Sequence, residues 1–281
     1  MSLKFRKLDS SDIDFALKVT ETEKWYLSEE DISFYLDNRG ATGIVALESS
    51  RPVGFATSVI YQHTAWIGNV IVAPEARNRG VGKQLVSELM EMLRREGIGN
   101  YHLYAYDRSR TLYERLGFRF DAAIWEIAIL GGRRKSDEAD MSLYRGYTDG
   151  VDKFDRTYFR ESREHVLKFA SSRRNSTLVY HRDSDGMVDG YYIENYVDES
   201  YGSEVAPFIS RKDALETLLS EVMGRAGILH LYVPQQNIGK VEDFAIPFQL
   251  VRRIHRGFLG RNEYLPELNG DVISAGFLET G

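Results

Sequence analysis

The feature that most constrains this chain is the immediate succession of a strand, a glycine loop and a long helix. In residues 69–90, NVIVAPEARNRGVGKQLVSELM, an apolar run ends at Pro74 and a loop with two glycines precedes a helical pattern. The apolar positions of that pattern recur every fourth residue, at Val81, Leu85, Leu89 and Leu93. A helix that begins directly after such a loop presents unpaired backbone N–H groups, and its dipole favours negative charge there. The succession therefore predicts a site for a phosphate or pyrophosphate group.

Two common phosphate loops do not fit these residues. The ATPase pattern GxxxxGK[ST] needs a glycine where the chain has Arg77 and a hydroxyl where it has Gln84. The dinucleotide pattern GxGxxG needs a glycine in place of Leu85. What remains is Arg77-x-x-Gly80-x-Gly82 after a strand. The alternative interpretation is a plain helix start with surface arginines.

Composition excludes several classes of function. The chain has 281 residues, a net charge of -6 and no cysteine, so disulfides, thiolate metal sites and a cysteine nucleophile are excluded. The six histidines lack metal-ligand spacing, and we expect no metal. No apolar run approaches the roughly 20 residues of a membrane span, and the first residues do not resemble a signal peptide. We therefore expect a cytoplasmic protein with neither a membrane nor a nucleic-acid partner.

The element pattern predicts two related halves. Helices are expected in residues 9–38, strands from 41 to 74, a helix from 80, a strand at 100–106, a short helix at 109–117 and a strand at 118–130. The glycine- and charge-rich GGRRKSDEAD then breaks the pattern. The second half repeats the order, with LHLYVP for YHLYAY and LLSEVMGRAG for LVSELMEMLRREG, and a last strand in QLVRRIHRGFLG. We predict domains at 1–132 and 146–281, joined by a linker at 133–145.

Two motifs in the first half resemble a known family. The Arg77-x-x-Gly80-x-Gly82 loop is similar to the Q/R-x-x-G-x-G/A motif of the GNAT acetyltransferases. Residues 109–118, SRTLYERLGF, are similar to the family's A-x-x-L-Y-x-x-x-G-F, with serine in place of alanine. The resemblance covers about the first 130 residues. It implies an α/β (α+β) fold of two GNAT-like domains, each a mixed, mostly antiparallel sheet flanked by helices. It also implies acetyl-CoA as co-substrate, with transfer of its acetyl group to a primary amine.

The resemblance places the coenzyme between two strands. In this family the fourth strand splays from the fifth, and the acetyl-pantetheine arm pairs with strand backbone in the gap. A backbone N–H of that strand would also stabilise the oxyanion that forms when the amine attacks the thioester. By resemblance, the backbone of Val70, Ile71 and Val72 contacts the arm, and the pyrophosphate lies against Arg77, Asn78, Arg79, Gly80, Val81, Gly82 and Lys83.

Tyr113 matches the family tyrosine that protonates the leaving thiolate. A phenol titrates near pH 10, so its neutral form is available as a donor at pH 7. The alternative is an aromatic side chain packed in the core. The glutamate that some members carry on the fourth strand corresponds here to Trp66. The base is therefore open among Glu21, Glu23, His63 and a chain of water molecules.

The acceptor is expected on the side of the first two helices. The segment EKWYLSEEDISFYL resembles the GW…D segment of a subset of the family, with Trp25 and Asp31 matching. Trp25, Tyr26 and Glu23 are the predicted substrate contacts, and the acids at positions 29 and 30 could attract a cationic amine. Helix packing for the aromatics and a solvated acidic face are the alternatives.

The second half resembles the degenerate C-terminal domain of two-domain acetyltransferases. It has no glycine pair, and Asp213 stands at its helix start, where it would repel a phosphate. We expect residues 194–202, ENYVDESYG, to complete the acceptor site, with a ligand-free surface loop as the alternative. The expected acceptor is a small-molecule amine. A protein N-acetyltransferase and a non-catalytic acyl-CoA sensor are the rival functions, and a homodimer stays open.

Overall fold

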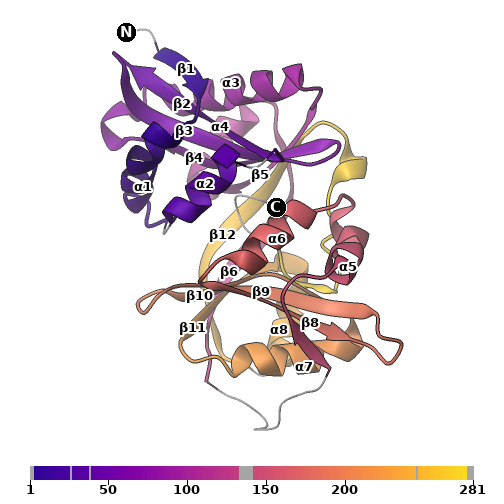
Figure 1. Ribbon diagram of the computed structural model, residues 1–281. Coiled ribbons are helices and arrows are strands. Elements are labelled where there is room, and N and C mark those ends of the chain that lie inside the picture. Colours follow the sequence, from indigo (N-terminus) through magenta and orange to yellow (C-terminus); the bar gives the residue numbers. More distant parts are fainter. Residues whose placement is uncertain (1–2, 26, 38, 133–141, 245, 277–281) are drawn as a thin grey trace. The chain divides into compact units, whose positions relative to one another are not determined.

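The computed structural model describes residues 3–276 except 26, 38, 133–141 and 245 (Figure 1). Its contacts divide the chain into two compact units. Of the described residues, the first comprises those up to Asp121 together with Arg256–Tyr264, and the second comprises Ala122–His255 together with residues 265–276. Most of the expected linker, residues 133–141, lies outside the described residues, and its end forms a short strand, β7 (Leu143–Arg145).

The first unit is a mixed, mostly antiparallel sheet, as the resemblance implies. Its strands run in the order β1-β2-β3-β4-β5-β12-β6; β4 and β5 are parallel, whereas β1 to β4 pair antiparallel. The elements are β1 (Leu3–Lys7), η1 (Ser10–Asp12), α1 (Ile13–Glu21), α2 (Glu29–Asp37), β2 (Ala41–Glu48), β3 (Arg51–Ile60), β4 (Thr64–Val72), η2 (Pro74–Ala76), α3 (Val81–Arg95), β5 (Asn100–Tyr106), η3 (Asp107–Ser109), α4 (Arg110–Glu114), β6 (Arg119–Leu130) and the end of β12 (Phe248–Leu259).

Alternation along the strands sends apolar side chains to both faces of this sheet. Ile44 and Ala46 of β2 pack in the cluster that includes α3 and α4, while Val45 between them packs with α1 and α2. Successive strand residues point to opposite faces, so a run buried throughout needs helices on both sides. The helices α1 and α2 accordingly cover one face and α3 the other (Figure 1).

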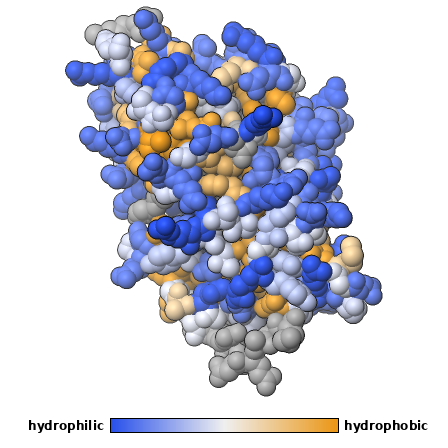
Figure 2. Space-filling view, viewed as in Figure 1, coloured by the Kyte–Doolittle hydropathy of each residue, from blue (hydrophilic) through white to orange (hydrophobic). Residues whose placement is uncertain are grey.

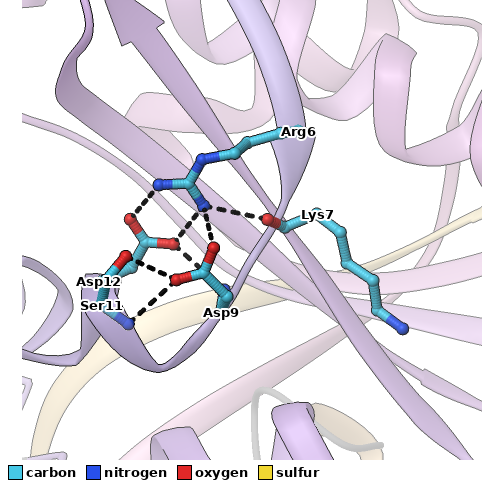
Figure 3. A network of polar contacts seen from close by, with 5 residues as sticks. All are labelled: Arg6, Lys7, Asp9, Ser11 and Asp12. Carbon is cyan, nitrogen blue, oxygen red and sulfur yellow. Dashed lines mark hydrogen bonds and ion pairs between the residues drawn. The ribbon is translucent and has the colours of Figure 1, made fainter.

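The turn before α1 is fixed by a polar network on β1 (Figure 3). Asp9 accepts from the backbone N–H of Ser11 at 2.9 Å, and Asp12 accepts from the backbone N–H of Asp9 at 3.1 Å, which forms a capping box. Arg6 donates to both carboxylate oxygens of the fully buried Asp12, at 2.6 and 2.8 Å. The predicted start of the helical region in DSSD is therefore confirmed.

The second unit repeats the architecture. Its strand order is β12-β6-β11-β10-β9-β8-β7, with β13 beside β10. The helices α5 and α6 contact β9 and β8, and α7 contacts β8, β9 and β10. The elements are α5 (Asp149–Phe159), α6 (Glu164–Ser172), β8 (Ser176–Arg182), β9 (Val188–Asp198), β10 (Gly202–Ser210), α7 (Lys212–Met223), β11 (Ile228–Pro234), η4 (Gln235–Asn237), α8 (Ile238–Asp243), η5 (Asn262–Tyr264, in the first unit) and β13 (Val272–Ser274).

Each unit contains a strand segment that is distant in sequence from the strand beside it. In the first unit β12 lies next to β5, and in the second unit β6 takes the corresponding place next to β11. The end of β12 is tightly fitted in the first unit: Arg256 forms an ion pair with Asp121, and a Cβ on Gly257 would lie 2.9 Å from the ring of Phe120. Each sheet is thus completed by a segment that is distant in sequence.

Three details differ from the sequence-based expectation. QLVRRIHRGFLG forms a strand, but β13 follows it, so it is not the last. The predicted helix over residues 151–170 is two helices, α5 and α6, because Arg160 adopts φ 70° between them. The letters VAP occur in both halves, at residues 72–74 and 205–207, but they are not equivalent, because Val72 is the last residue of β4 whereas residues 205–207 lie inside β10.

The visible face of the molecule carries mostly hydrophilic residues, with hydrophobic ones scattered among them (Figure 2). Among the described residues, no helix has both the length and the apolar character needed to cross a membrane.

Candidate active site

The fourth strand of the first unit parts from the fifth halfway along. The parallel ladder joins Thr64–Ile67 to Asn100–Leu103 and stops there, although both strands continue. At the same point β4 carries a bulge: Gly68 faces Thr57 and Ile71 faces Phe55, so β4 has one residue more than β3. Such bulges redirect a strand and end pairing next to functional sites. The predicted splay is therefore present.

Asn69 holds the bulge in place. Its backbone has φ 47°, a left-handed conformation that asparagine tolerates better than most residues. Its buried side chain donates from Nδ2 to Thr57 Oγ1 at 3.0 Å. The backbone of Val70, Ile71 and Val72 follows, beyond the end of the ladder with β5. These residues lie where the coenzyme arm is predicted to pair; that role stays a prediction.

The loop between β4 and α3 has the backbone geometry of an anion-binding turn. Asn78 and Gly80 have positive φ values of 60° and 79°, and Gly80 is the N-cap of α3. The first intrahelical bond runs from the N–H of Gln84 to the Gly80 carbonyl at 3.1 Å. The N–H groups of Val81, Gly82 and Lys83 therefore precede the first helical hydrogen bond and are oriented for an external acceptor.

Arg77 ties this loop to the first helical region. Its guanidinium donates to the Val72 carbonyl at 2.9 Å and to Thr22 Oγ1 at 3.1 Å, and it forms a 3.0 Å ion pair with Glu23. Glu23 also pairs with Arg108, which follows β5. The side chain of Arg77 is thus engaged within the protein, where it fixes the end of β4.

The remaining cations of the loop differ in exposure and partners. Arg79 pairs with Glu48 of β2, and this hydrogen-bonded pairing lowers the pKa of the Glu48 carboxyl. Lys83 and Asn78 are exposed at the start of the helix and beside it. The charge most directly available to a phosphate is therefore that of Lys83, supported by the dipole of α3.

Tyr113 lies on α4, in the same core cluster as α3. It is 7% exposed, and its ring makes an edge contact with Phe118 at a centroid distance of 5.9 Å. Burial raises the pKa of Tyr113 well above the ordinary value of a tyrosine. The phenol therefore stays protonated at neutral pH, as a proton donor must. Tyr113 is therefore packed in the core and also keeps the proton that a donor needs, so both hypotheses from the sequence remain compatible with it. Its catalytic role stays a prediction.

No carboxylate is present on β4. Trp66 is fully buried and packs against His102 and Tyr104 of β5, at centroid distances of 5.3 and 4.9 Å. An aromatic cluster thus replaces the acid–base residue at the base of the splay.

The candidate bases lie in three different settings. Glu23 is bound by two arginines, Arg77 and Arg108. Glu21 is exposed at the last residue of α1. His63 precedes the first residue of β4, at the end far from the loop, and stacks on Tyr264 at 5.1 Å. Of these three side chains, that of Glu23 contacts the loop through its ion pair with Arg77.

The predicted acceptor contacts follow α1. Trp25 packs partly buried against the cluster of α1 and α2, and its backbone N–H donates to Thr20. Asp31 accepts from the N–H and hydroxyl of Ser28 and so caps the start of α2. Glu29 is exposed in the first turn of α2, as is its neighbour at position 30. Tyr26 lies outside the described residues.

The second unit lacks this site at each corresponding position. The strands β5 and β11 share HLY at residues 102–104 and 230–232, and counting onward from them places Val241 where the first unit has Tyr113. Arg211 with φ −64° caps α7, without the left-handed turn of Gly80. Residues 194–202 join β9 to β10, and Tyr201 stacks on His230 at 3.9 Å. Their role toward an acceptor stays a prediction.

Sequence reasoning missed two features that shape the site. The bulge at Asn69 had one signal, an asparagine inside an apolar strand. No sequence signal indicated that Arg256–Leu259 completes the first sheet, because the residues of a strand do not by themselves determine which strand it pairs with.

The described residues fit acetyl-coenzyme A. A pantetheine arm offers amides for the unpaired part of β4, and a pyrophosphate suits the N–H groups at the start of α3. Among the described residues there is no group of three or more His, Cys, Asp or Glu side chains that could hold a metal ion.

Comparison with known proteins agrees with this geometry. The sequence model of the Acetyltransferase (GNAT) family matches residues 10–118. A glucosamine 6-phosphate N-acetyltransferase from Trypanosoma brucei brucei is 31% identical over 133 residues, which is 42% of this chain and 90% of that enzyme.

Two solved structures share the fold of nearly the whole chain. A putative acetyltransferase from Pyrococcus horikoshii has a TM-score of 0.79 at 17% identity, covering 99% of this chain and 96% of that one. A tandem GNAT protein from the clavulanic acid biosynthesis pathway has a TM-score of 0.63 at 13% identity, covering 93% and 100%. The motifs, the splayed strand and these relatives lead to one conclusion: the chain belongs to the GNAT family of acetyltransferases, whose members in general use acetyl-CoA.

Proposed function

We propose that the first unit transfers the acetyl group of acetyl-CoA to the primary amine of a small molecule. The observation that carries this proposal is that three structural features follow one another along one segment of the chain. The ladder between β4 and β5 stops at Ile67, the bulge at Asn69 follows, and the left-handed Gly80 opens α3. An arm that pairs with β4 thus leads directly to the anion-binding turn.

Two further observations favour a small amine as acceptor. The Trypanosoma relative is named for glucosamine 6-phosphate, which is a small primary amine. Acidic residues of α2, with Glu29 exposed among them, give a cationic amine a favourable field on the helical side of the sheet.

The roles of this chain's residues follow from their positions. Acetyl-CoA supplies the acetyl group and the sulfur that leaves as a thiolate. The β4 backbone after the bulge orients the arm, and the N–H groups of Val81, Gly82 and Lys83 hold the pyrophosphate. Tyr113 Oη keeps its proton at neutral pH and gives it to the departing sulfur. Because Trp66 occupies the place of a strand-borne carboxylate and Glu23 already binds two arginines, we assign removal of the amine proton to water.

Thiol release tests the proposal. The full chain is mixed with acetyl-CoA and a panel of small primary amines, amino sugars included, and with a panel of peptides that have free N-termini. We expect amine-dependent thiol release with at least one small amine and none with the matching secondary or tertiary amines. Release with peptides alone would establish the protein N-acetyltransferase. Coenzyme binding without release for any acceptor would favour the non-catalytic sensor.

A further inference from the structure

The second unit repeats the splayed fourth strand of the first. In β10 the parallel ladder to β11 joins Ser203–Val205 to Leu229–Leu231 and stops, as the ladder of β4 stops at Ile67. A bulge follows here too, because Val205 faces Glu194 and Phe208 faces Tyr192, again with one residue more on the fourth strand. Both units therefore release the end of the fourth strand from the fifth.

In the second unit the released backbone is paired by the chain's own C-terminal segment. The strand β13 runs antiparallel to β10, with Ser274 opposite Phe208 and Val272 opposite Ile209. The N–H of Ser210 donates to the Asp271 carbonyl at 2.9 Å. β13 thus lies along the part of β10 that corresponds to the coenzyme-facing part of β4.

The same segment also bonds to the fifth strand. The N–H of Tyr232 donates to Ser274 Oγ at 2.8 Å, and the N–H of Ala275 donates to the Tyr232 carbonyl at 2.7 Å. β13 therefore bridges β10 and β11 at the point where their own ladder has ended, as an added strand would.

The side chains of β13 are buried. Val272, Ile273, Ser274 and Ala275 are each at most 3% exposed. Ile273 packs in the apolar cluster of the second unit with residues of α7, such as Leu218. Burial of such an apolar side chain stabilises the folded state relative to exposure.

Hydrogen bonds also hold the residues that lead into β13. Asn237, at the start of α8, donates from Nδ2 to the carbonyls of Asn269 and Val272, at 2.7 and 2.8 Å. Tyr158 of α5 donates to Asp271 at 2.9 Å, and its carbonyl accepts from the N–H of Glu267 at 2.7 Å. The segment is thus anchored by elements on either side of it.

We infer that the second unit contains a strand-binding site between β10 and β11, and that residues 267–275 are its built-in ligand. The ligand class is an extended peptide, recognised by backbone hydrogen bonds and by an apolar side chain at the position of Ile273. The comparison with the coenzyme arm rests on the proposed function of the first unit; the strand-binding site does not, because its contacts lie wholly within the second.

The site can be tested with the full chain. The recognition sequence of a site-specific protease is inserted between Tyr264 and Leu265, where the chain passes from the first unit to the second. After cleavage, we expect residues 265–281 to stay with the protein through gel filtration in native buffer and to leave in denaturant. Loss of the fragment in native buffer would overturn the inference.

Exchange with labelled synthetic peptides identifies what holds the fragment. A peptide of residues 265–281 should replace the cleaved fragment, and the same peptide with Ile273→Asp should not, since it would place a carboxylate in the apolar cluster. The matched control is Glu267→Gln, at an exposed position, which removes the charge of the ion pair with Arg160 and keeps an amide oxygen that can still accept from Asn269; it should exchange within a few-fold of the parent peptide. Equal exchange of the Ile273→Asp peptide would contradict the site. No coenzyme is present, so failure here is distinct from failure of the proposed acetyltransferase.

Discussion

Gly54 connects the packing of the first sheet to the proposed coenzyme site. It lies on β3 opposite Val72, and a Cβ built on it would meet the Ile71 carbonyl oxygen at 2.7 Å and Leu85 Cδ1 at 3.0 Å. The oxygen belongs to the β4 backbone, so it can give way only if β4 moves. Gly54→Ala should therefore shift the strand segment that is predicted to pair with the coenzyme arm.

The expected magnitude follows from two opposing effects. Overpacking a well-packed core costs about 1–3 kcal/mol, whereas replacing glycine by alanine stabilises by about 0.4–1 kcal/mol through the unfolded chain. Gly99→Ala is the matched control, since nothing lies within 4 Å of a Cβ there. The stabilisation through the unfolded chain is common to Gly54→Ala and Gly99→Ala, whereas overpacking affects Gly54→Ala alone. The free energy of unfolding of Gly54→Ala should therefore be lower by about 1–3 kcal/mol.

Urea unfolding of the two variants measures this difference, and steady-state kinetics measure its effect on the site. Displacement of a positioning strand by a fraction of an ångström to about 1 Å should lower kcat/KM for acetyl-CoA by roughly ten- to a hundredfold in Gly54→Ala only. Equal stabilities and equal kcat/KM in the two variants would refute the reasoning.

Three further predictions concern single side chains of the first unit. Tyr113→Phe should lower the single-turnover rate by roughly 10²–10⁴-fold with coenzyme affinity kept; an unchanged rate where chemistry is limiting would return Tyr113 to a packing role. Burial lowers the pKa of His102 to about 4, below the roughly 6.5 of an unfolded histidine. As the pH falls below 6.5, the unfolded chain binds a proton that the folded protein does not bind until the pH is near 4. The free energy of unfolding should therefore be unaffected by His102 above pH 6.5 and should fall by about 3 kcal/mol as the pH drops through 4. Urea unfolding at several pH values should show that this loss is absent in His102→Phe and present in the control His63→Gln, and identical pH profiles would contradict it. Lys83→Glu should weaken coenzyme binding by roughly tenfold or more while thermal stability holds, because a carboxylate near the start of α3 favours the helix; calorimetry and thermal unfolding check both.

Local patterns predicted the helices and central strands well. The every-fourth-residue repeat from Val81 to Leu93 predicts α3, and the glycines before it predict the turn in which Gly80 adopts a left-handed conformation. The resemblance implies the splay of β4, and the ladder between β4 and β5 ends at Ile67, before the residues that are predicted to contact the arm. These features depend on residues close together in the sequence or on a motif that carries its own geometry.

The features that escaped prediction are set by distant contacts. The sequence left open whether Trp25 contacts the acceptor or packs between helices, because its packing with α1 and α2 depends on neighbours that its motif does not name. The role of Arg77 at the pyrophosphate stays a prediction, and the sequence did not indicate that its guanidinium contacts Val72, Thr22 and Glu23. β13 is only three residues long, and its pairing with β10 is visible only once the bulge in β10 is known.

Calorimetric titration of the full chain with coenzyme A tests the central claim most directly. The proposed coenzyme site is at the loop of the first unit, whereas the corresponding start of α7 in the second unit has no such loop and β10 pairs with β13. We therefore predict one site per chain in the unaltered protein. Gly82→Trp should abolish binding, because a Cβ there would already contact Leu112 and Val72 at 3.4 and 3.6 Å; Gly99→Trp, at an open position, should bind normally. Two coenzyme sites per chain, or full binding by Gly82→Trp, would contradict the account.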